Sequence, residues 1–448
     1  MGARGKIGYY RAMNLYDQSW QLTDLLEGDD KVYLRCEPEV PDFTVRASFK
    51  LVIWNLRQKV ELDVTPENIL NVAALCDATI FNKEHVKRLY VWGLKSFCTY
   101  LHAFSPKFVI PGNNIIDLKT IEGFLGIRKP RPENLVEMLN RTEIAGRFQG
   151  WPKVYKLIHQ PLSLQVLPSI ETTPLLNDRS RKCEYPYYEI EGQINGRMNC
   201  LKKHANSYLP HNMGPDVRAE LKPPEYALRF CTADFRHCEV NVLQWLSGDE
   251  ILKEILDSGG DLHKRIYEIV TGNACDTDKK RALSKKMFLP VMYGCGPNGL
   301  ATNLDVSASV GGELCKRIYH SFPTATRYMK ECQEKAKSGV VFDYFGRPRK
   351  FQEGKSYLFR NTTVQAVAAT VCQEKLIALW KSLDGVARLA FSVHDGYGVL
   401  CETPTAKQTY RIVKDTLEKE SELCSGLKMK VEVKFGARLN KMKVLWRD

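Results

Sequence analysis

The sequence predicts a mixed fold of the α/β and α+β classes, divided into two or three domains. The chain has 448 residues, of which 44% are hydrophobic and 26% charged, as in a globular protein with sizeable cores. Its first part alternates like β-strands and then becomes helical. Its second part is mostly helical before strands return. Length, composition and these changes of hydrophobic period together define the fold class.

The first domain is expected to have strands followed by helices. Strand-like alternation occupies residues 31–62, in KVYLRCEPEV, FTVRASFKLVIWNL and KVELDV. Helical periods follow in PENILNVAALCD and KEHVKRLYVWGLKSFCTYLHAF, and this part ends near IIDLKTIEGFLGI. We therefore expect an α/β domain over residues 1–130. The prolines of KPRPENLVEMLNRT open a second region, 131–225, in which helices alternate with polar loops.

The second half begins with the strand YALRFCTADF near residue 226, and helical patterns then dominate residues 238–338. Residues 339–448 return to strands, with helices expected at TTVQAVAATVCQEKLIALWKSL and TAKQTYRIVKDTLEKES and a last strand at KMKVEVKFG. The stretch FSVHDGYGVL is interpreted as a hairpin. Asp395-Gly396 between two apolar runs is a turn signal, because both residues can adopt positive φ.

The charge predicts a polyanionic partner. The chain carries 65 Lys and Arg against 52 Asp and Glu, which gives +13, and nucleic acid is the commonest polyanion that such a protein meets. No apolar run is long enough to span a bilayer, and the basic N-terminus does not resemble a signal peptide. The 14 cysteines form no C-x-x-C pair, which indicates reduced thiols. Cys200, His204 and His211 lack a second cysteine at zinc-ligand spacing, so we interpret them as loop residues.

Two carboxylates stand at the ends of predicted strands. Asp234 closes the strand RFCTADF before a helix that begins near Cys238, and Asp395 stands at the hairpin tip. Taken singly, Asp234 fits a helix N-cap and Asp395 fits a turn residue. Taken together in one sheet, they fit a pair of Mg²⁺ ions, which prefer hard oxygen ligands. Two such ions about 4 Å apart activate an attacking oxygen and stabilise a leaving one.

A third element is the basic helix KKRALSKKMFLPVMYGCG. Arg281, Lys285, Leu289 and Tyr293 recur every four residues and so share one stripe, about 18 Å long at about 1.5 Å per residue. Two cations, an apolar residue and an aromatic ring match the order of phosphates, sugar and base in a nucleoside triphosphate. The alternative is a solvated basic helix that packs its tyrosine inward, and Pro290 is expected to kink it.

These three elements resemble motifs A, B and C of family A DNA polymerases, the bacterial DNA polymerase I type. Asp234 and Glu239 match motif A, Arg281, Lys285 and Tyr293-Gly294 match motif B, and His394-Asp395 match motif C. Further segments agree in order: NGRMN, GGDLHKRIYEIVTG, YFGRPR, NTTVQAVAAT and VEVKFGARLNKMKVLW. The resemblance covers about residues 185–448.

The resemblance implies a right-hand polymerase with palm, fingers and a short thumb, behind an N-terminal RNase H-like domain of the exonuclease type. The implied divisions are 1–130 for the exonuclease-like domain, 131–225 for the thumb and the start of the palm, 226–262 for the motif A palm, 263–338 for the fingers and 339–448 for the motif C palm. The implied activity is template-directed addition of dNTPs to a primer 3′-hydroxyl. The implied setting is the cytoplasm of a bacterium or of a phage-infected cell.

The family's site residues carry over by position. The implied catalytic residues are Asp234, Asp395 and Lys285; the two aspartates hold two Mg²⁺, with Mn²⁺ as a substitute, and Lys285 donates a proton to pyrophosphate. The implied nucleotide-binding residues are Arg281, Lys285, Tyr293, Glu239, His237, Leu289 and His263. The implied DNA-binding residues are Arg197, Asn361, Gln365, His394 and Arg347.

Two departures from the family pattern leave alternatives open. Gly396 stands where bacterial DNA polymerases usually carry Glu, and Leu289 stands where they carry Phe or Tyr. At both positions the sequence is closer to single-subunit RNA polymerases of the phage type. Glu239 favours DNA synthesis, because a carboxylate there would clash with a ribose 2′-hydroxyl. A catalytically inactive nucleic-acid-binding protein is a further alternative.

The first domain resembles the family's 3′–5′ proofreading domain without its metal ligands. That domain needs Asp-x-Glu on its first strand, and here Arg35 occupies the Asp position of VYLRCE. We therefore expect no proofreading. A short thumb implies low processivity without a processivity factor or another replisome protein.

Overall fold

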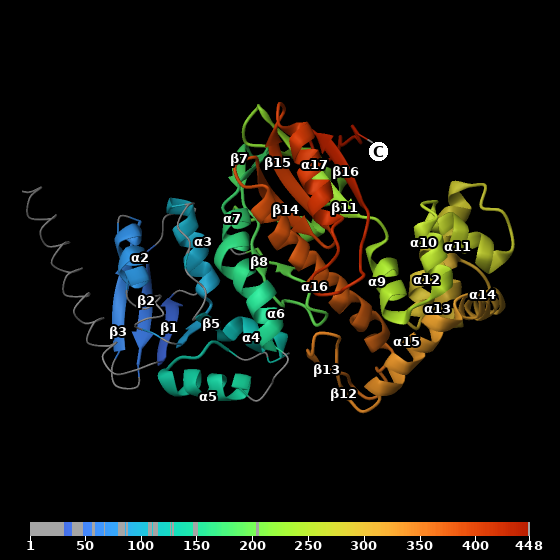
Figure 1. The fold of residues 1–448 in the computed structure, drawn as a ribbon, viewed down its shortest axis with the longest axis horizontal. Helices are drawn as coiled ribbons and strands as arrows, with labels where there is room; N and C mark the ends of the chain where they lie inside the picture. The colour runs from blue at the N-terminus through green and yellow to red at the C-terminus, as the bar shows by residue number, and fades with distance from the viewer. Residues whose placement is uncertain are drawn as a thin grey trace, which may run out of the picture.

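The structure is a computed structural model that describes residues 31–37, 48–55, 59–66, 68–78, 86, 88–105, 110, 115–125, 127, 130–146, 151–202 and 206–446. Figure 1 shows three bodies along the long axis. A sheet with helices α2 and α3 lies at one end, and a second sheet, crossed by the long helix α16, lies in the middle. A group of helices, α10 to α14, lies at the other end.

The N-terminal sheet confirms the three predicted strands between residues 31 and 64. They are β1 (Lys31–Glu37), β2 (Phe49–Trp54) and β3 (Lys59–Val64), followed by α2 (Ile69–Ala78). The sheet continues through β4 (Arg88–Trp92) and β5 (Ile115–Asp117), with α3 (Leu94–Phe104) between them and α4 (Leu118–Phe124) after them. The strand order is β3-β2-β1-β4-β5. β1 pairs antiparallel with β2, and β2 with β3, whereas β1 and β4, and β4 and β5, run parallel.

The segment KEHVKRLYVWGLKSFCTYLHAF was predicted to be one helix, and this was wrong. Its first half forms β4, whose Leu89, Val91 and Trp92 are at most 4% exposed, and Gly93 at φ 72° separates it from α3. A strand buried on both faces has a continuous apolar run, and hydrophobic period alone cannot distinguish it from a buried helix.

Residues 131–222 link the two sheets through helices and short strands. The helical elements are α5 (Leu135–Gly146), α6 (Trp151–Val154), the π-helical turns η1 (Tyr155–His159) and η2 (Leu162–Val166), α7 (Leu167–Glu171), η3 (Pro210–Asn212) and α8 (Pro215–Glu220). Of these, α6, η1, η2 and α7 follow one another without a break as one helix over residues 151–171. The strands are β6 (Leu175–Asn177), β7 (Lys182–Glu184), β8 (Tyr188–Glu189), β9 (Asn199–Cys200) and β10 (Leu221–Lys222). His204 lies outside the described residues. Within them, no group of three or more His, Cys, Asp or Glu is arranged to hold a metal ion.

The second sheet has four strands in the order β14-β15-β11-β16. They are β14 (Ala387–Val393), β15 (Gly396–Glu402), β11 (Leu228–Phe235) and β16 (Val431–Gly436), all antiparallel to their neighbours. Alternate residues of β11 point to opposite faces. Cys231 and Ala233 join the core formed with α16 (Leu358–Ser382) and α17 (Ala406–Leu417), whereas Phe230 joins a smaller core on the other face.

The helical body confirms the expectation for residues 238–338. It comprises α9 (Cys238–Ser247), α10 (Glu250–Asp257), α11 (Leu262–Thr271), α12 (Asp278–Met292), α13 (Pro297–Leu304), α14 (Ala308–Ser321) and α15 (Pro323–Ala336). The hairpin of β12 (Val340–Phe342) and β13 (Pro348–Lys350) follows. Helix α12 continues through Pro290 to Met292. Pro290 lies in the last turn of the helix, so only the hydrogen bond that its own N–H would have donated is missing. None of the helices in the described ranges is both long and apolar enough to cross a membrane.

Candidate active site

The central strand β11 and the β14–β15 hairpin bring Asp234 and Asp395 together. Asp234 is the penultimate residue of β11, where it pairs with Gly396, and the next residue, Phe235, donates its N–H to the carbonyl of Asp395 at 3.2 Å. The hairpin tip therefore lies directly against the end of the central strand. Asp234 is not a helix N-cap, because α9 begins four residues later at Cys238, with His237 as its N-cap.

The hairpin turn differs from the predicted one. Val393 and Gly396 form the last strand pair, so the two loop residues are His394 and Asp395 rather than Asp395 and Gly396. His394 adopts φ 54°, and Gly396 does not have positive φ. A positive φ in a non-glycine residue is unusual, and such residues gather at functional sites. The turn thus places both motif C side chains at the tip.

Gly396 is required by packing rather than by the turn. A Cβ at this position would lie 2.1 Å from Oδ1 of Asp234, so the carboxylate occupies the space that any other side chain would fill. Because real Cβ atoms essentially never approach that closely, a larger residue would have to displace the carboxylate.

The two carboxylates reach solvent and lack ion pairs: Asp234 is exposed and Asp395 is half-buried. Burial raises the pKa of Asp234, and Lys434 and Arg218 partly offset this effect. Burial also raises the pKa of Asp395, and the neighbouring Asp234 raises it further. In the described part of the chain, neither carboxylate forms a salt bridge. Two such acids held side by side without a salt bridge are suited to a bound cation.

His394 packs on a second histidine. The rings of His394 and His211 are stacked, with centroids 5.0 Å apart and planes 9° from parallel. Burial lowers the pKa of both, that of His211 to about 4, so both rings are neutral near pH 7. His211 therefore belongs to the site as a neutral support for His394. The sequence had indicated only that His211 is a loop residue.

Glu239 in α9 accepts hydrogen bonds from three predicted site residues. Arg197 donates at 2.8 Å, the Tyr293 hydroxyl at 2.5 Å and Gln365 at 3.2 Å. Asn195 donates to Gln365 at 2.8 Å and accepts from the N–H of Arg197 at 3.1 Å. The structure thus brings motifs A and B, the NGRMN segment and α16 to one carboxylate. Asn195 was missed in the sequence, although it stands two residues before Arg197.

The predicted phosphate-binding residues gather between α9, α11 and α12. Arg281 forms an ion pair with Asp261 at 2.6 Å, and the rings of His237 and His263 meet edge to face at 5.2 Å. Burial lowers the pKa of both histidines, that of His263 to about 4, with further lowering from the cations Lys285 and Arg281. Lys285 is exposed and has no salt bridge in the described structure. Leu289 packs partly buried against the core.

Two predicted DNA-binding residues have different surroundings. Asn361 is half-buried in the first turn of α16, where its Oδ1 has no partner among the described residues. Arg347 was predicted to contact DNA, but its side chain is 0% exposed. It donates to Glu191 at 2.8 Å and to Thr370 at 2.9 Å. A guanidinium buried in this way cannot reach DNA in this conformation; it supports the turn at Gly196, whose Cβ position lies 3.1 Å from it.

Comparisons with known proteins agree with this geometry. The sequence profile of DNA polymerase family A matches residues 189–441, more than half of the chain. DNA polymerase I of Chloroflexus aurantiacus is 24% identical over 345 residues, which cover 71% of this chain and 36% of that protein. DNA polymerase I of Bacillus caldotenax is 26% identical over 242 residues, covering 50% of this chain and 27% of that protein. The chain thus spans about a third or less of the length of these relatives.

The fold also resembles a solved structure, the POL domain of Pol1 from M. smegmatis in a complex with DNA primer-template and dNTP. The TM-score is 0.73 at 13% identity, and the match covers 95% of this chain and 98% of that one. At this identity the likeness concerns the fold, which is shared across both sheets and the helical body. Together with the profile match, it shows that the chain belongs to DNA polymerase family A.

Proposed function

We propose that the protein is a DNA-directed DNA polymerase that adds dNTPs to a primer 3′-hydroxyl. The observation that carries this proposal is the meeting of Asp234 and Asp395 at the end of one sheet, with no salt bridge to either carboxylate among the described residues. The exposed cation Lys285 and the paired Arg281 stand on α12 in the helical body. A site that neutralises and aligns phosphates needs both components.

The donor set fits Mg²⁺. Mg²⁺ is usually held by one or two carboxylates with substrate phosphates and water supplying the other ligands, and Asp234 and Asp395 are two hard oxygen donors without protein partners. In this proposal the two residues hold two ions, with Mn²⁺ as a substitute. Bound metal supplies activation of the attacking 3′-oxygen and stabilisation of the leaving oxygen.

The chain's own residues bind and orient the reactants. In this proposal Arg281 and Lys285 hold the triphosphate, with His237 and His263 beside them, and Lys285 donates a proton to the pyrophosphate leaving group. Because both histidines are neutral near pH 7, the charge in this part of the site comes from Arg281 and Lys285. Leu289 and Tyr293 line the positions of sugar and base.

Sugar selection rests on Glu239. Three donors hold its carboxylate in one place, so a ribose 2′-hydroxyl would have to displace an anchored group rather than a mobile one. His394, Arg197, Asn361 and Gln365 are proposed to contact primer or minor groove. Leu289 leaves less bulk near the sugar than an aromatic residue would, so we expect incomplete exclusion of NTPs.

The direct test is extension of a labelled primer on a DNA template with Mg²⁺ and either dNTPs or NTPs. We expect extension with dNTPs and at most slow extension with NTPs. Preferential use of NTPs, or initiation without a primer, would favour a phage-type RNA polymerase instead. Salt-sensitive DNA binding without extension under any metal would identify an inactive binding protein.

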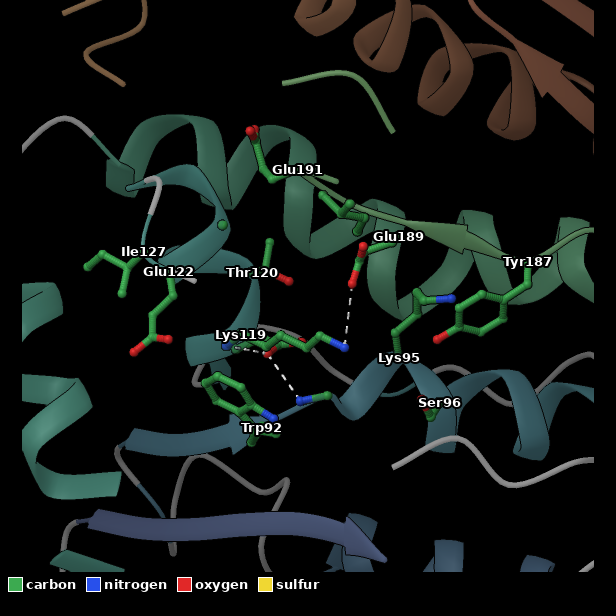
Figure 2. A pocket seen from close by; sticks show the side chains of 14 residues that line it. Trp92, Lys95, Ser96, Lys119, Thr120, Glu122, Ile127, Tyr187, Glu189 and Glu191 are labelled. Carbon is green, nitrogen blue, oxygen red and sulfur yellow. Dashed lines mark hydrogen bonds and ion pairs between the residues drawn. The ribbon is translucent and has the colours of Figure 1, made fainter. Parts of the chain in front are cut away.

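We infer further that the N-terminal domain is a nuclease-like scaffold without activity. Its order of strands and helices supports this, and Arg35 on β1 stands where a metal-binding Asp would be needed. Figure 2 shows the pocket at the ends of β4 and β5. Of the carboxylates that line it, Glu122 pairs with Arg141 and Glu191 with Arg347. Asp117 accepts the N–H groups of Gly93 at 3.3 Å and Lys119 at 3.1 Å, and Lys119 lies 3.8 Å from Glu189. Carboxylates held in this way are poorly suited to a metal pair.

The subdomain limits, the phage-type character and the dependence on a processivity factor are part of the same proposal. Among the described residues of 131–222, the helices longer than six residues are α5 and the continuous helix 151–171 made of α6, η1, η2 and α7, and this small number supports a small thumb. Product lengths measured under conditions where each enzyme binds once, with and without extract from a host cell, test this point. Long products from the purified protein alone would contradict it.

A further inference from the structure

A cavity of about 300 Å³ opens beside Asp234 on the second sheet. Asp234 and Thr232 line it from β11 and Lys434 lines it from β16, where Lys434 pairs with Thr232 in the strand register. These side chains point away from the α16 core, because the alternate residues Cys231 and Ala233 belong to that core. The cavity therefore lies on the face of the sheet opposite the α16 core, beside the smaller core of Phe391 and Leu439 and next to one of the two proposed metal-binding carboxylates.

Two cations lie at this cavity. Arg218 is exposed and uses its Nε to donate to the carbonyl of Met213 at 3.1 Å, and it has no salt bridge in the described residues. Lys434 is 38% exposed and pairs with Glu432 on the same strand. An ammonium group has three donors, so this pairing leaves Lys434 able to bind a second acceptor. Both cations are close enough to Asp234 to lower its pKa.

Much of the remaining lining is apolar, although Asn440 and Tyr397 also border the cavity. Phe391, Val393, Leu439 and Met442 complete much of the wall. A cavity that combines cations with apolar surface suits a ligand with an anionic end and a less polar body, such as a sugar-phosphate unit. The cations of α12, Arg281 and Lys285, belong to a different element and are already assigned to the triphosphate. The cavity beside Asp234 therefore has a second, separate pair of phosphate-binding groups.

We propose that Arg218 and Lys434 bind a backbone phosphate of the primer strand close to its 3′ end. This rests on the proposed function, which requires a primer 3′-hydroxyl at Asp234 and so brings the last phosphodiesters of the primer to the same face. The apolar wall packs against the adjoining sugar. Lys434 keeps Glu432 as a partner and uses a free donor for the phosphate, whereas Arg218 offers its terminal nitrogens.

The experiment compares the full chain with Arg218→Ala, Lys434→Ala, Lys434→Arg and a control, Lys428→Ala. Lys428 is an exposed lysine just before β16 that does not line the cavity. Binding of a fluorescent primer–template is measured at several salt concentrations without dNTP, and KM is measured separately for primer–template and for dNTP. Each alanine variant is expected to weaken DNA binding about 5- to 10-fold and to reduce the slope of log K against log salt by about one. Lys434→Arg and Lys428→Ala should retain the wild-type slope, and KM for dNTP should change less than about twofold.

Unchanged salt slopes in both alanine variants would overturn the assignment. A rise in KM for dNTP with no change in primer binding would also overturn it, because the cations would then serve the triphosphate. Should Lys434→Ala fail to fold, Lys434→Gln keeps most of the alkyl stem and provides the same comparison. The binding measurement needs no catalysis. If the wild-type protein and the variants show the expected salt slopes but the wild-type protein never extends the primer, only the proposed activity is refuted.

Discussion

The two large sheets of this protein treat carboxylates in opposite ways. At the end of the second sheet, Asp234 and Asp395 lie side by side without salt bridges in the described residues. At the end of the N-terminal sheet, Asp117 accepts two backbone N–H groups and Glu122 is paired with Arg141 at 2.7 Å. The difference teaches that acids at strand ends indicate chemistry only where the protein leaves their charge uncompensated.

The largest expected effect comes from removing one of the two charges of the Asp234–Asp395 pair. Asp395→Asn should reduce primer extension by at least about a thousandfold, equivalent to about 4 kcal/mol, because one proposed metal ligand loses its charge. Primer–template binding should remain within about threefold, since phosphate contacts supply most of the affinity. Asp415→Asn, on the exposed side of α17, is the matched control for extension rate. Loss of folding together with binding would instead show that Asp395 is only a turn residue.

The second prediction tests whether Gly396 is needed to keep the Asp234 carboxylate in position. Gly396→Ala should lower kcat about 10- to 100-fold, because the new Cβ would meet Oδ1 of Asp234 at 2.1 Å and turn the carboxylate away. The Mg²⁺ concentration needed for half-maximal rate should rise as well. Gly396→Glu, which restores the residue usual in bacterial relatives, should be no better. Gly312→Ala is the control, since its Cβ has room, with Pro297 3.8 Å away; equal rates in both variants would refute the steric account.

A third experiment asks whether the N-terminal sheet can be given nuclease chemistry. Arg35 is 6% exposed, donates to the carbonyl of Pro132 at 2.5 Å and lies 5.2 Å from the Trp54 ring centre. Arg35→Asp should therefore lower the free energy of unfolding by about 1–3 kcal/mol, measured by urea denaturation. It should not produce metal-dependent degradation of single-stranded DNA, assayed in the Asp234→Asn background. Degradation by this variant, or by the parent protein, would contradict the inactive-scaffold proposal.

The smallest effect concerns Asp117. Burial raises its pKa to about 6, whereas an unfolded Asp has a pKa near 3.9. Between these values the folded state binds more protons than the unfolded state, so this group makes the protein less stable as pH rises. From pH 5 to pH 7 the loss is about 1 kcal/mol. Urea denaturation at both pH values should show that Asp117→Asn lacks this part of the pH dependence, and an identical dependence in both proteins would show that Asp117 titrates normally.

Much of the site could be predicted from the sequence because its residues lie at fixed intervals on regular elements. Asp234 and Glu239 span a strand end and a helix start, and Arg281, Lys285, Leu289 and Tyr293 follow one helical face. Hydrophobic period also predicted β1 to β3, β11 and the long helix α16. It misassigned β4, because a buried parallel strand has no alternation to detect.

Other features arise from contacts between distant segments, which no local pattern records. The sequence by itself determined the basic charge, the order of the motifs and the hairpin that carries Asp395. Only the tertiary structure decided that His211 stacks on His394, that Arg347 is buried against Glu191, and that Arg218 and Lys434 reach the cavity beside Asp234. The tertiary structure also explains why residue 396 is glycine. The carboxylate of Asp234, which lies on a neighbouring strand 162 positions away in sequence, fills the space that a side chain at residue 396 would need. Short-range periodicity reports which way a side chain faces, whereas packing between elements determines what it meets.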